Sequence, residues 1–453
     1  MSKKTAAQPP EKLTGIKLTK VPKTSVGLKA IVSALTHVKN EVGIVKGISL
    51  LKNINQKDGF DCPGCAWPDP DEKRAFLAEY CENGAKAVAE EATKNKVSPL
   101  FFASHSVDEL AKFSDYEIGK SGRITHPMYL PEGKNNYEEI SWSKAFQLIA
   151  QELNELNSPD EAIFYTSGRT SNEAAFLYQL FVRQFGTNNL PDCSNMCHES
   201  SGVALSETLG IGKGSVTLDD FNHADLIIVI GQNPGTNHPR MLTALSETKK
   251  KGGKIITINP LPEVGLINYK DPQNPLKWIG KGQNLTDLFL QVKINGDVAL
   301  LKIILKLMKE KEDDKPNSVF NHQFINEKTD GLDTLLKDLD TYSIDDLIPQ
   351  TGLALKEIEK AAELIINNDK VIICWAMGLT QHKNAVDNIR EIVNILLLKG
   401  SIGKKGAGTC PVRGHSNVQG DRTMGIWEKM PGSFLDKLDA EFDFKSPRKH
   451  GFD

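Results

Sequence analysis

Two short cysteine motifs are the residues of this chain best suited to chemistry. The segment 191–202 reads PDCSNMCHESSG, with Cys193 and Cys197 four apart and His198 directly after the second thiol. A thiolate is a nucleophile and a soft metal ligand, and an imidazole can accept a proton. The segment has too few ligands for a zinc knuckle, and sequence neighbours rarely face each other as nucleophile and base. Two interpretations stay open: a functional Cys197 thiolate beside His198, or two buried cysteines with a satisfied histidine.

The second motif lies on a loop at 58–72, DGFDCPGCAWPDPDE, which carries Cys62 and Cys65. Thiolates at this spacing converge and can chelate one metal centre. A helix is predicted over 73–95, and it contributes a third thiol, Cys81. An iron–sulfur centre is favoured, because no second CxxC or nearby HxxxH completes a zinc set and the flanks do not suggest a thioredoxin-like motif. A zinc site and a loop without metal remain alternatives.

The elements that must position these motifs alternate between strand and helix. Apolar runs bounded by turn residues predict buried strands. These strands are expected at 161–168, 224–231, 254–260 and 371–378. Amphipathic stretches predict helices at 171–186, 239–253 and 384–400, the first with Ser171 as N-cap and Gly186 as C-cap. Such alternation indicates an α/β fold with open, mostly parallel sheets and helices on both faces.

Ligands of such sheets bind outside the carboxyl ends of the strands, which draws attention to the loops there. The loop 231–240, GQNPGTNHPR, has glycines between a strand and a helix, where backbone N–H groups can approach phosphate. There is no P-loop and no convincing Rossmann fingerprint, so a nicotinamide dehydrogenase is a weak hypothesis. The segment 408–420, GTCPVRGHSNVQG, surrounds Arg413 with polar residues, which fits either an anion site or a solvated loop.

Composition bounds the class of protein. The 453 residues carry a net charge of −3, with 39% hydrophobic and 25% charged residues, so two to four globular domains are expected. This charge gives no argument for nucleic acid or an anionic membrane surface. The seven cysteines are an odd number, which argues against a disulfide framework. No apolar run reaches the roughly 18–20 residues of a membrane span, and no secretory signal is evident, so a cytoplasmic location is expected.

Taken in order, these motifs resemble the molybdopterin oxidoreductases of the dimethyl-sulfoxide-reductase superfamily, in the branch of formate dehydrogenase alpha subunits. The resemblance runs from about 58 to 453. It rests on the early cysteine loop, CSNMCHESSGVAL, ADLIIVIGQNPGTNHPR, WAMGLTQH and NILLLKGSIGKKGAGTCPVRGHSNVQGDRTMG. The family carries out two-electron chemistry at molybdenum, so the resemblance implies an enzyme that oxidises a small anionic substrate such as formate.

The resemblance also implies roles for individual residues. Cys197 corresponds to the protein ligand of molybdenum, His198 to the adjacent active-site histidine, and Arg413 to the arginine that holds the substrate. The loops at the strand ends would hold molybdenum bis(molybdopterin guanine dinucleotide). The implied cofactor-binding residues are Gly231, Asn233, Pro234, His238, Asn259, Met377, Gly378, Gln381, Gly414, Asn417 and Gln419.

A [4Fe–4S] cluster is implied in the cysteine loop. Cys62, Cys65 and Cys81 match three of its ligands, and the remaining position falls on Asp69, whose carboxylate could ligate iron. The family's lysine between cluster and pterin corresponds to Asn83. Electrons from the substrate would reach this cluster and then an electron-transfer partner protein. The alternative is a non-catalytic iron–sulfur or zinc-binding α/β subunit that acts in protein interaction.

The family's layout predicts the domains. Residues 1–55 form an N-terminal extension and 56–124 a small cysteine region of iron–sulfur type. Residues 193–413 form the molybdopterin-binding α/β domain, and 125–192 with 414–453 form a discontinuous, incomplete α/β domain, which gives two Rossmann-like lobes. The family's C-terminal dinucleotide-binding domain is expected to be missing, and a second chain could supply it.

Overall fold

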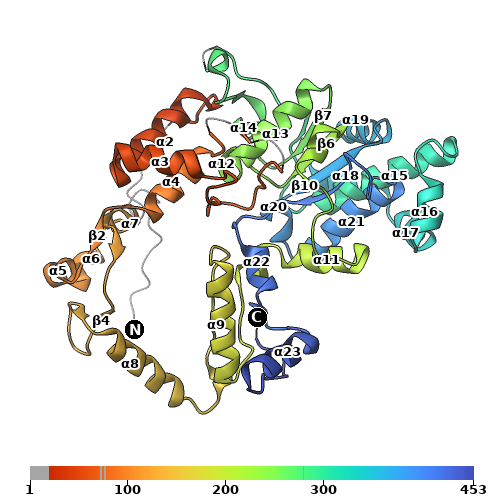
Figure 1. Cartoon of the computed structure of the whole chain (residues 1–453). Helices are drawn as coiled ribbons and strands as arrows, with labels where there is room; N and C mark the ends of the chain where they lie inside the picture. The colour runs from red at the N-terminus through yellow and green to blue at the C-terminus, as the bar shows by residue number, and fades with distance from the viewer. Residues whose placement is uncertain (1–19, 72–73, 76–77, 279, 453) are drawn as a thin grey trace.

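A five-stranded parallel sheet forms the centre of the computed structural model, which describes residues 20–71, 74–75, 78–278 and 280–452 (Figure 1). Its strand order is β11-β10-β6-β7-β9. The strands are β6 (Leu226–Ile230), β7 (Lys254–Ile258), β9 (Leu288–Leu290), β10 (Val371–Trp375) and β11 (Gly408–Pro411). Three of them, β6, β7 and β10, occupy predicted runs, and the predicted α/β class is confirmed.

The middle strands β6 and β10 are apolar and buried throughout because both faces of the sheet are covered there. Ile228 pairs in register with Ile256 and Ile373, and these side chains pack into the core on one face. That core includes residues of α11 (Glu199–Leu209), α15 (Asp297–Asp314), α19 (Leu355–Ile366) and α21 (Ala385–Leu398). The neighbouring residues Ile227 and Ile255 point to the other face, against α13 (Pro239–Lys250). Each fully buried isoleucine side chain stabilises this arrangement by roughly 1.5–3 kcal/mol.

A topological switch lies between β6 and β10. The chain continues from β6 to β7 on one side, whereas β10 and β11 add on the other side, so a crevice opens at the carboxyl ends of β6 and β10. Here Gly378 N donates to Gly231 O at 3.0 Å. A Cβ on Gly378 would lie 2.5 Å from that oxygen, and Gly231 has φ +61°. Glycine is therefore required at both strand ends for the two loops to meet.

The cysteine region is built on three helices, α2 (Gly27–Val42), α3 (Ile44–Asn53) and α4 (Glu82–Glu91), at the upper left of Figure 1. Ala34 and Val38 of α2 share a hydrophobic core with Ala85 and Val88 of α4. The described part of the predicted N-terminal extension thus packs on the cysteine region; residues 1–19 lie outside the described residues. The domain boundaries stay a prediction.

The helix predicted over 73–95 is shorter than expected. Residues 74–75 and 78–81 are not helical, and α4 begins only after Cys81. Cys81 is the N-cap, and its Sγ accepts the backbone N–H of Gly84 at 3.3 Å. Glu79, two residues before Cys81, is held outside the helix because its carbonyl oxygen accepts a hydrogen bond from Asn55 Nδ2 at 2.7 Å. The helix start therefore places a thiol where an N-cap oxygen usually stands.

Residues 158–192 and 414–452 pack together around α9 (Asn172–Phe185). In Figure 1, α9 lies beside α22 (Val418–Thr423), with α23 (Gly432–Phe442) near its lower end and α8 (Trp142–Asn154) farther out. Arg183 of α9 is fully buried and donates to the carbonyls of Gly425 at 2.8 Å and Trp427 at 2.9 Å. The predicted caps of α9 are confirmed, with Ser171 accepting at its start and Gly186 left-handed at its end.

The strand predicted at 161–168 is wrong. Its pairing is limited to one parallel bridge between Thr166 and Asp192 and one hydrogen bond from Phe164 N to Asn189 O. The neighbouring chain does not run alongside as a ladder, because Asn189 turns its amide back to the carbonyls of Asp160 and Ala162. An apolar run needs a partner strand in register before it becomes a strand.

Short elements complete the described chain. The strands are β1 (Ser25–Val26), β2 (Lys96–Val97), β3 (Arg123–Ile124), β4 (Met128–Tyr129), β5 (Glu138–Glu139) and β8 (Tyr269–Lys270). The helices are α5 (Pro99–Ser104), α6 (Val107–Leu110), α7 (Asp115–Ser121), α10 (Cys193–Cys197), α12 (Pro234–Asn237), α14 (Val264–Ile267), α16 (His322–Lys328), α17 (Leu332–Asp340), α18 (Ile344–Thr351), α20 (Met377–Thr380), η1 (Pro159–Glu161), η2 (Asp219–Asn222) and η3 (Pro275–Lys277). Among the described residues, none of the helices combines the length and apolarity that a membrane span requires.

Candidate functional site

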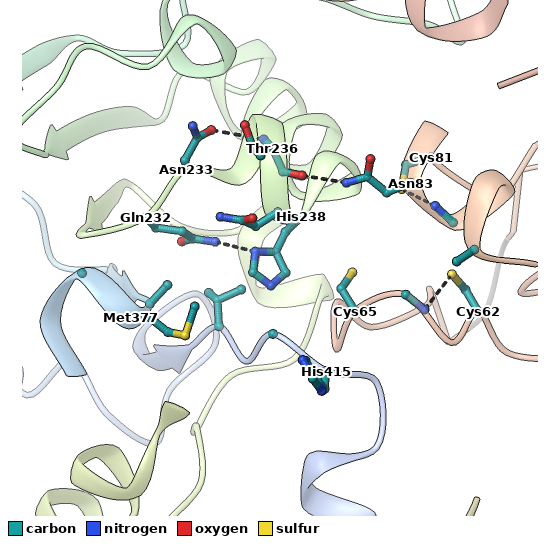
Figure 2. Close-up of a pocket in the computed structure, with 18 of the residues that line it drawn as sticks. Cys62, Cys65, Cys81, Asn83, Gln232, Asn233, Thr236, His238, Met377 and His415 are labelled. Atoms are coloured by element: carbon teal, nitrogen blue, oxygen red, sulfur yellow. Dashed lines mark hydrogen bonds between the residues drawn. The ribbon is translucent and has the colours of Figure 1, made fainter. Parts of the chain in front are cut away.

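A cavity of about 420 Å³ lies where the cysteine region meets the carboxyl ends of β6, β10 and β11. Figure 2 shows the cysteines on one side of it and Gln232, His238 and Met377 on the other. The cavity wall brings together, of the predicted site residues, Cys62, Cys65, Cys81, Gly231, Asn233, His238, Met377, Gly378 and Gly414. Segments separated by more than 300 residues in the chain therefore form one site.

Other predicted cofactor-binding residues support the loops of this cavity without lining it. Asn259, after β7, donates from Nδ2 to Gln232 O at 2.7 Å. Gln381 donates from Nε2 to Met196 O at 3.0 Å. Pro234 is the first residue of α12, where its fixed φ suits a helix start. Their observed contacts hold one loop to the next.

The last two predicted cofactor residues lie in the segment that leads into α22. Asn417 donates from Nδ2 to Thr170 O at 2.6 Å and so holds the loop before α9. Gln419 is exposed on α22. Neither residue is part of the cavity wall.

Cys197 ends the short helix α10, beside the cavity residue Gly414. Burial raises the pKa of its thiol, whereas the backbone N–H of Gly414 and the guanidinium of Arg413 lower it. The backbone is fixed as well, since Thr380 Oγ1 donates to Cys197 O at 2.5 Å. The tertiary structure thus sets a hydrogen-bond donor and a cation next to this thiol, both of which favour the thiolate.

His198 follows Cys197 but points into the protein. It is 1% exposed, its Nδ1 lies 2.9 Å from Ser201 Oγ, and its Nε2 has no hydrogen-bond partner. Ser201 Oγ also accepts the indole N–H of Trp375 at 2.9 Å. Burial first, and then the charge of Arg413, lower the pKa of His198 to about 3, so the side chain is neutral here.

Arg413 is 8% exposed and contacts the site through both its backbone and its charge. Its carbonyl oxygen lies 2.8 Å from His238 Nε2, and its Nη2 donates to Gly212 O at 3.0 Å. Burial and the nearby Arg422 lower the pKa of its guanidinium, while Cys197 raises it. Arg413 therefore lies within electrostatic reach of Cys197, behind the cavity wall.

Arg422 is a site residue that the sequence analysis missed. Its guanidinium lies 3.2 Å from Asp192 Oδ1 and 2.7 Å from Glu199 Oε2. Asp192 is the N-cap of α10, and Glu199 starts α11. Arg422 therefore joins α22 to the two helices on either side of Cys197.

Three thiols face the cavity from the cysteine region. Cys62 Sγ accepts the N–H of Gly64 at 3.3 Å, as Cys81 Sγ does from Gly84. Burial raises the pKa of the Cys62 thiol to about 11, although Arg240 acts in the opposite direction. Among the described residues, no set of three or more His, Cys, Asp or Glu is grouped to hold a single metal ion. Thiolates of an iron–sulfur cluster bind different iron atoms, so their sulfurs stand farther apart than the ligands of one ion.

Asp69 and Asn83 take positions that differ from those of the thiols. Asp69 is not on the cavity wall; it forms ion pairs with Arg240 and Arg74. Asn83 lines the cavity and donates from Nδ2 to Thr236 O at 2.6 Å, which connects α4 directly to α12 (Figure 2).

Gln232 is the most informative cavity residue that was not predicted. It is 2% exposed, its Nε2 lies 3.4 Å from His238 Nδ1, and its Oε1 has no hydrogen-bond partner. A buried oxygen without a partner on a cavity wall is a ready acceptor for a ligand N–H. His415, also on the wall, has a buried Nδ1 without a partner. The loop motifs included both residues, but no pattern revealed which side chains turn inward.

Asp421 gives the site a testable pH dependence. It is fully buried, and burial and the charge of Asp192 raise its pKa to about 7, although the hydrogen bond from Asn417 opposes this. Its charge also acts on Cys193. Between the ordinary value of 3.8 and about 7, the folded chain binds a proton that the unfolded chain does not. The free energy of unfolding therefore falls by up to ~1.4 kcal/mol per pH unit as the pH rises through this range.

We expect Asp421→Asn to remove this dependence, because the amide mimics the protonated acid. Thermal unfolding midpoints of the variant and the wild type should be similar near about pH 4, and the variant should be the more stable near about pH 8. A constant difference at all pH values would contradict this assignment.

Comparisons with known proteins identify relatives of this chain. Residues 123–434 match the sequence model of the family described as molybdopterin oxidoreductase. An uncharacterized oxidoreductase of Mycobacterium tuberculosis is 54% identical over 429 residues, which are 95% of this chain and 55% of that protein. The Escherichia coli protein YdeP is 44% identical over 431 residues, 94% of this chain and 56% of the relative. The chain thus spans about half the length of these curated relatives.

Two more distant matches were also found. The alpha subunit of an F420-dependent formate dehydrogenase of Methanococcus maripaludis is 28% identical over 357 residues, 77% of this chain and 49% of the relative. Acetylene hydratase from Pelobacter acetylenicus superposes with a TM-score of 0.52 at 20% identity, over 62% of this chain and 36% of that one. At this identity the structural likeness concerns the fold alone.

Proposed function

This chain belongs to the molybdopterin oxidoreductase family, and from that premise we propose that it is a molybdenum-dependent oxidoreductase of formate-dehydrogenase type. The proposed reaction removes two electrons from a small anionic substrate such as formate, HCOO⁻ → CO₂ + H⁺ + 2 e⁻. One observation carries the proposal: the thiols of the cysteine region and the loops at the strand ends line the same cavity, next to Cys197.

The residues present fit a pterin cofactor. The unpartnered Oε1 of Gln232 and Nδ1 of His415 offer hydrogen bonds to a polar ring. The glycine contact between Gly231 and Gly378 brings bare backbone to the cavity, and the volume falls in the range of roughly 300–1,000 Å³ typical of ligand sites. We propose the bis(guanine dinucleotide) form, held by the strand-end loops. When bound, this cofactor supplies the two-electron redox chemistry at molybdenum.

The chain's own residues take two roles in this proposal. Cys197 holds the metal through its thiolate, which Gly414 N–H and Arg413 favour. Arg413 attracts the anionic substrate to the same place by charge. His198 lies directly beside Cys197, but its burial and its pKa of about 3 do not favour it as the acceptor of the proton that the oxidation releases.

Electrons leave through the cysteine region in this proposal. Cys62, Cys65 and Cys81 hold an iron–sulfur cluster, and Asn83 joins its helix to the pterin loop through the hydrogen bond to Thr236. This bond connects α4 to α12 at the loop after β6. A cluster at these thiols would supply one-electron transfer to an electron-transfer partner protein.

The experiment is to isolate the 453-residue chain from a host that makes the cofactor and to measure bound molybdenum and pterin. Formate-dependent reduction of a viologen dye is assayed with the chain alone and with a polypeptide that matches the remaining length of the relatives. Stoichiometric molybdenum and pterin are expected. A chain that carries neither in both preparations would refute the proposal.

A matched pair of variants makes this test specific for the cavity. Gln232→Leu removes the unpartnered acceptor and is expected to weaken pterin retention roughly tenfold, because a buried hydrogen bond to a ligand is worth about 1–3 kcal/mol. Gln323→Leu makes the same change on the exposed side of α16 and should leave pterin content unchanged. Equal pterin content in the two variants would place the cofactor elsewhere.

A further inference from the structure

Asp69 has both carboxylate oxygens engaged by arginines. Its Oδ1 lies 2.5 Å from Arg240 Nη1, and its Oδ2 lies 3.2 Å from Arg74 Nη1. The side chain is 18% exposed, so these arginines replace much of its hydration. A carboxylate that ligates iron must turn a lone pair to the metal, and here each oxygen is already directed at a guanidinium.

Arg240 has a second carboxylate partner on the same side of the site. It also pairs with Glu79, and the side chains of Arg240 and Glu79 are only 15% and 9% exposed. Arg240 belongs to α13, which packs on the central sheet, whereas Asp69 and Glu79 precede α4 in the cysteine region. These ion pairs thus hold the cysteine loop against the sheet. If Asp69 turned to a metal, the largely buried guanidinium of Arg240 would lose one of its two carboxylate partners.

Unlike Asp69, the three thiols of the cysteine region, Cys62, Cys65 and Cys81, are on the cavity wall. The four other cysteines lie elsewhere: two on α10, and two paired in register on β10 and β11. The described residues therefore turn three cysteine thiols, and no fourth, toward this part of the cavity.

We propose that Asp69 is an anchor for Arg240 and not an iron ligand, so that a cluster bound here has three protein thiolates and one iron without a protein ligand. This rests on the proposed function only in that a cluster binds at these cysteines. The iron without a thiolate is then exchangeable. An oxidant such as ferricyanide takes one electron as that iron leaves, [4Fe–4S]²⁺ → [3Fe–4S]⁺ + Fe²⁺ + e⁻.

The test uses the full chain, reconstituted anaerobically with iron and sulfide and then treated with ferricyanide. Electron paramagnetic resonance follows the [3Fe–4S]⁺ signal, and iron analysis follows the released Fe²⁺. The wild type and Asp69→Asn are expected to convert to the same extent and at similar rates. Asp61→Asn, an exposed carboxylate on the same loop, is the matched control.

A ligand role for Asp69 predicts a different result. The wild type would then resist conversion, and Asp69→Asn would convert at least roughly tenfold faster, since loss of a metal's immediate partner has effects of that size or more. That result would overturn the inference, as would a chain that binds no iron. Iron binding and its spectrum do not depend on molybdenum, so this failure is separate from a failure of the proposed function.

A second measurement tests the anchor without any metal. In the metal-free chain, Asp69→Asn and Arg240→Gln should both increase proteolytic cleavage within 58–81, because each breaks the same ion pair. A residue that serves only as an iron ligand predicts no change in the metal-free chain. Unchanged cleavage in Asp69→Asn would therefore count against the anchor role.

Discussion

Replacing Cys197 by alanine is expected to lower substrate turnover by at least roughly 100-fold, because even groups that only support a metal ligand cost 10–100-fold when removed. The thiol lies beside Gly414 N–H and Arg413, which lower its pKa against the opposite effect of burial. Alanine leaves no atom to hold the metal. Molybdenum content and dye reduction, measured on the same preparation, are the two readouts.

Cys193 provides the matched control on the same helix. Its Sγ accepts the N–H of Gly168 at 3.2 Å, and it is 6% exposed. Cys193→Ala removes the same atoms from a packed position, so we expect a stability loss of about 1 kcal/mol with molybdenum content retained. If both alanine variants kept full turnover, Cys197 would not be the metal ligand.

Arg240→Gln is expected to loosen the cysteine region from the sheet by about 3–5 kcal/mol, the usual cost of removing one partner of a buried ion pair. Glu79 would then lose this cation, and Asp69 would keep only Arg74. Hydrogen–deuterium exchange of residues 62–85 measures this directly, because a local opening exchanges these amides. A loss of roughly 3 kcal/mol corresponds to more than 100-fold faster exchange.

Arg390→Gln is the control for that prediction. Arg390 also pairs with two carboxylates, Glu207 and Asp387, but its side chain is 44% exposed. Exposed pairs contribute about 0–1 kcal/mol, so exchange near α21 should change little. If both substitutions changed local exchange equally, the burial of Arg240 would not account for the strength of its ion pairs.

The central sheet was readily predicted because β6, β7 and β10 are buried on both faces. A continuous apolar run between turn residues is sufficient evidence for such a strand. The strand predicted at 161–168 was wrong because Asn189 and its neighbours do not offer this apolar run a ladder to pair with. The extent of the helix after Cys65 depended on the cap at Cys81, which the apolar pattern did not mark.

The family was predicted correctly from the order of the motifs, and the match over 123–434 confirms it. The sequence indicated which loops form the candidate site, but not which of their side chains turn into the cavity. Gly231 and Gly378 were expected from the family resemblance, whereas Gln232, Arg240 and Arg422 were missed. Their roles depend on which partner approaches from a distant part of the chain.

The sequence by itself determined the chemistry that is available: thiols at 62, 65, 81 and 197, a histidine beside the last of them, and loops after apolar strands. Residue types and their local spacing are properties of the sequence itself, so these features could be predicted without a structure. Only the tertiary structure decided which thiols share a cavity and that Asp69 is turned away from it toward Arg240. The direction of a side chain follows from packing and charge partners that lie up to hundreds of residues away, and local pattern carries no information about them.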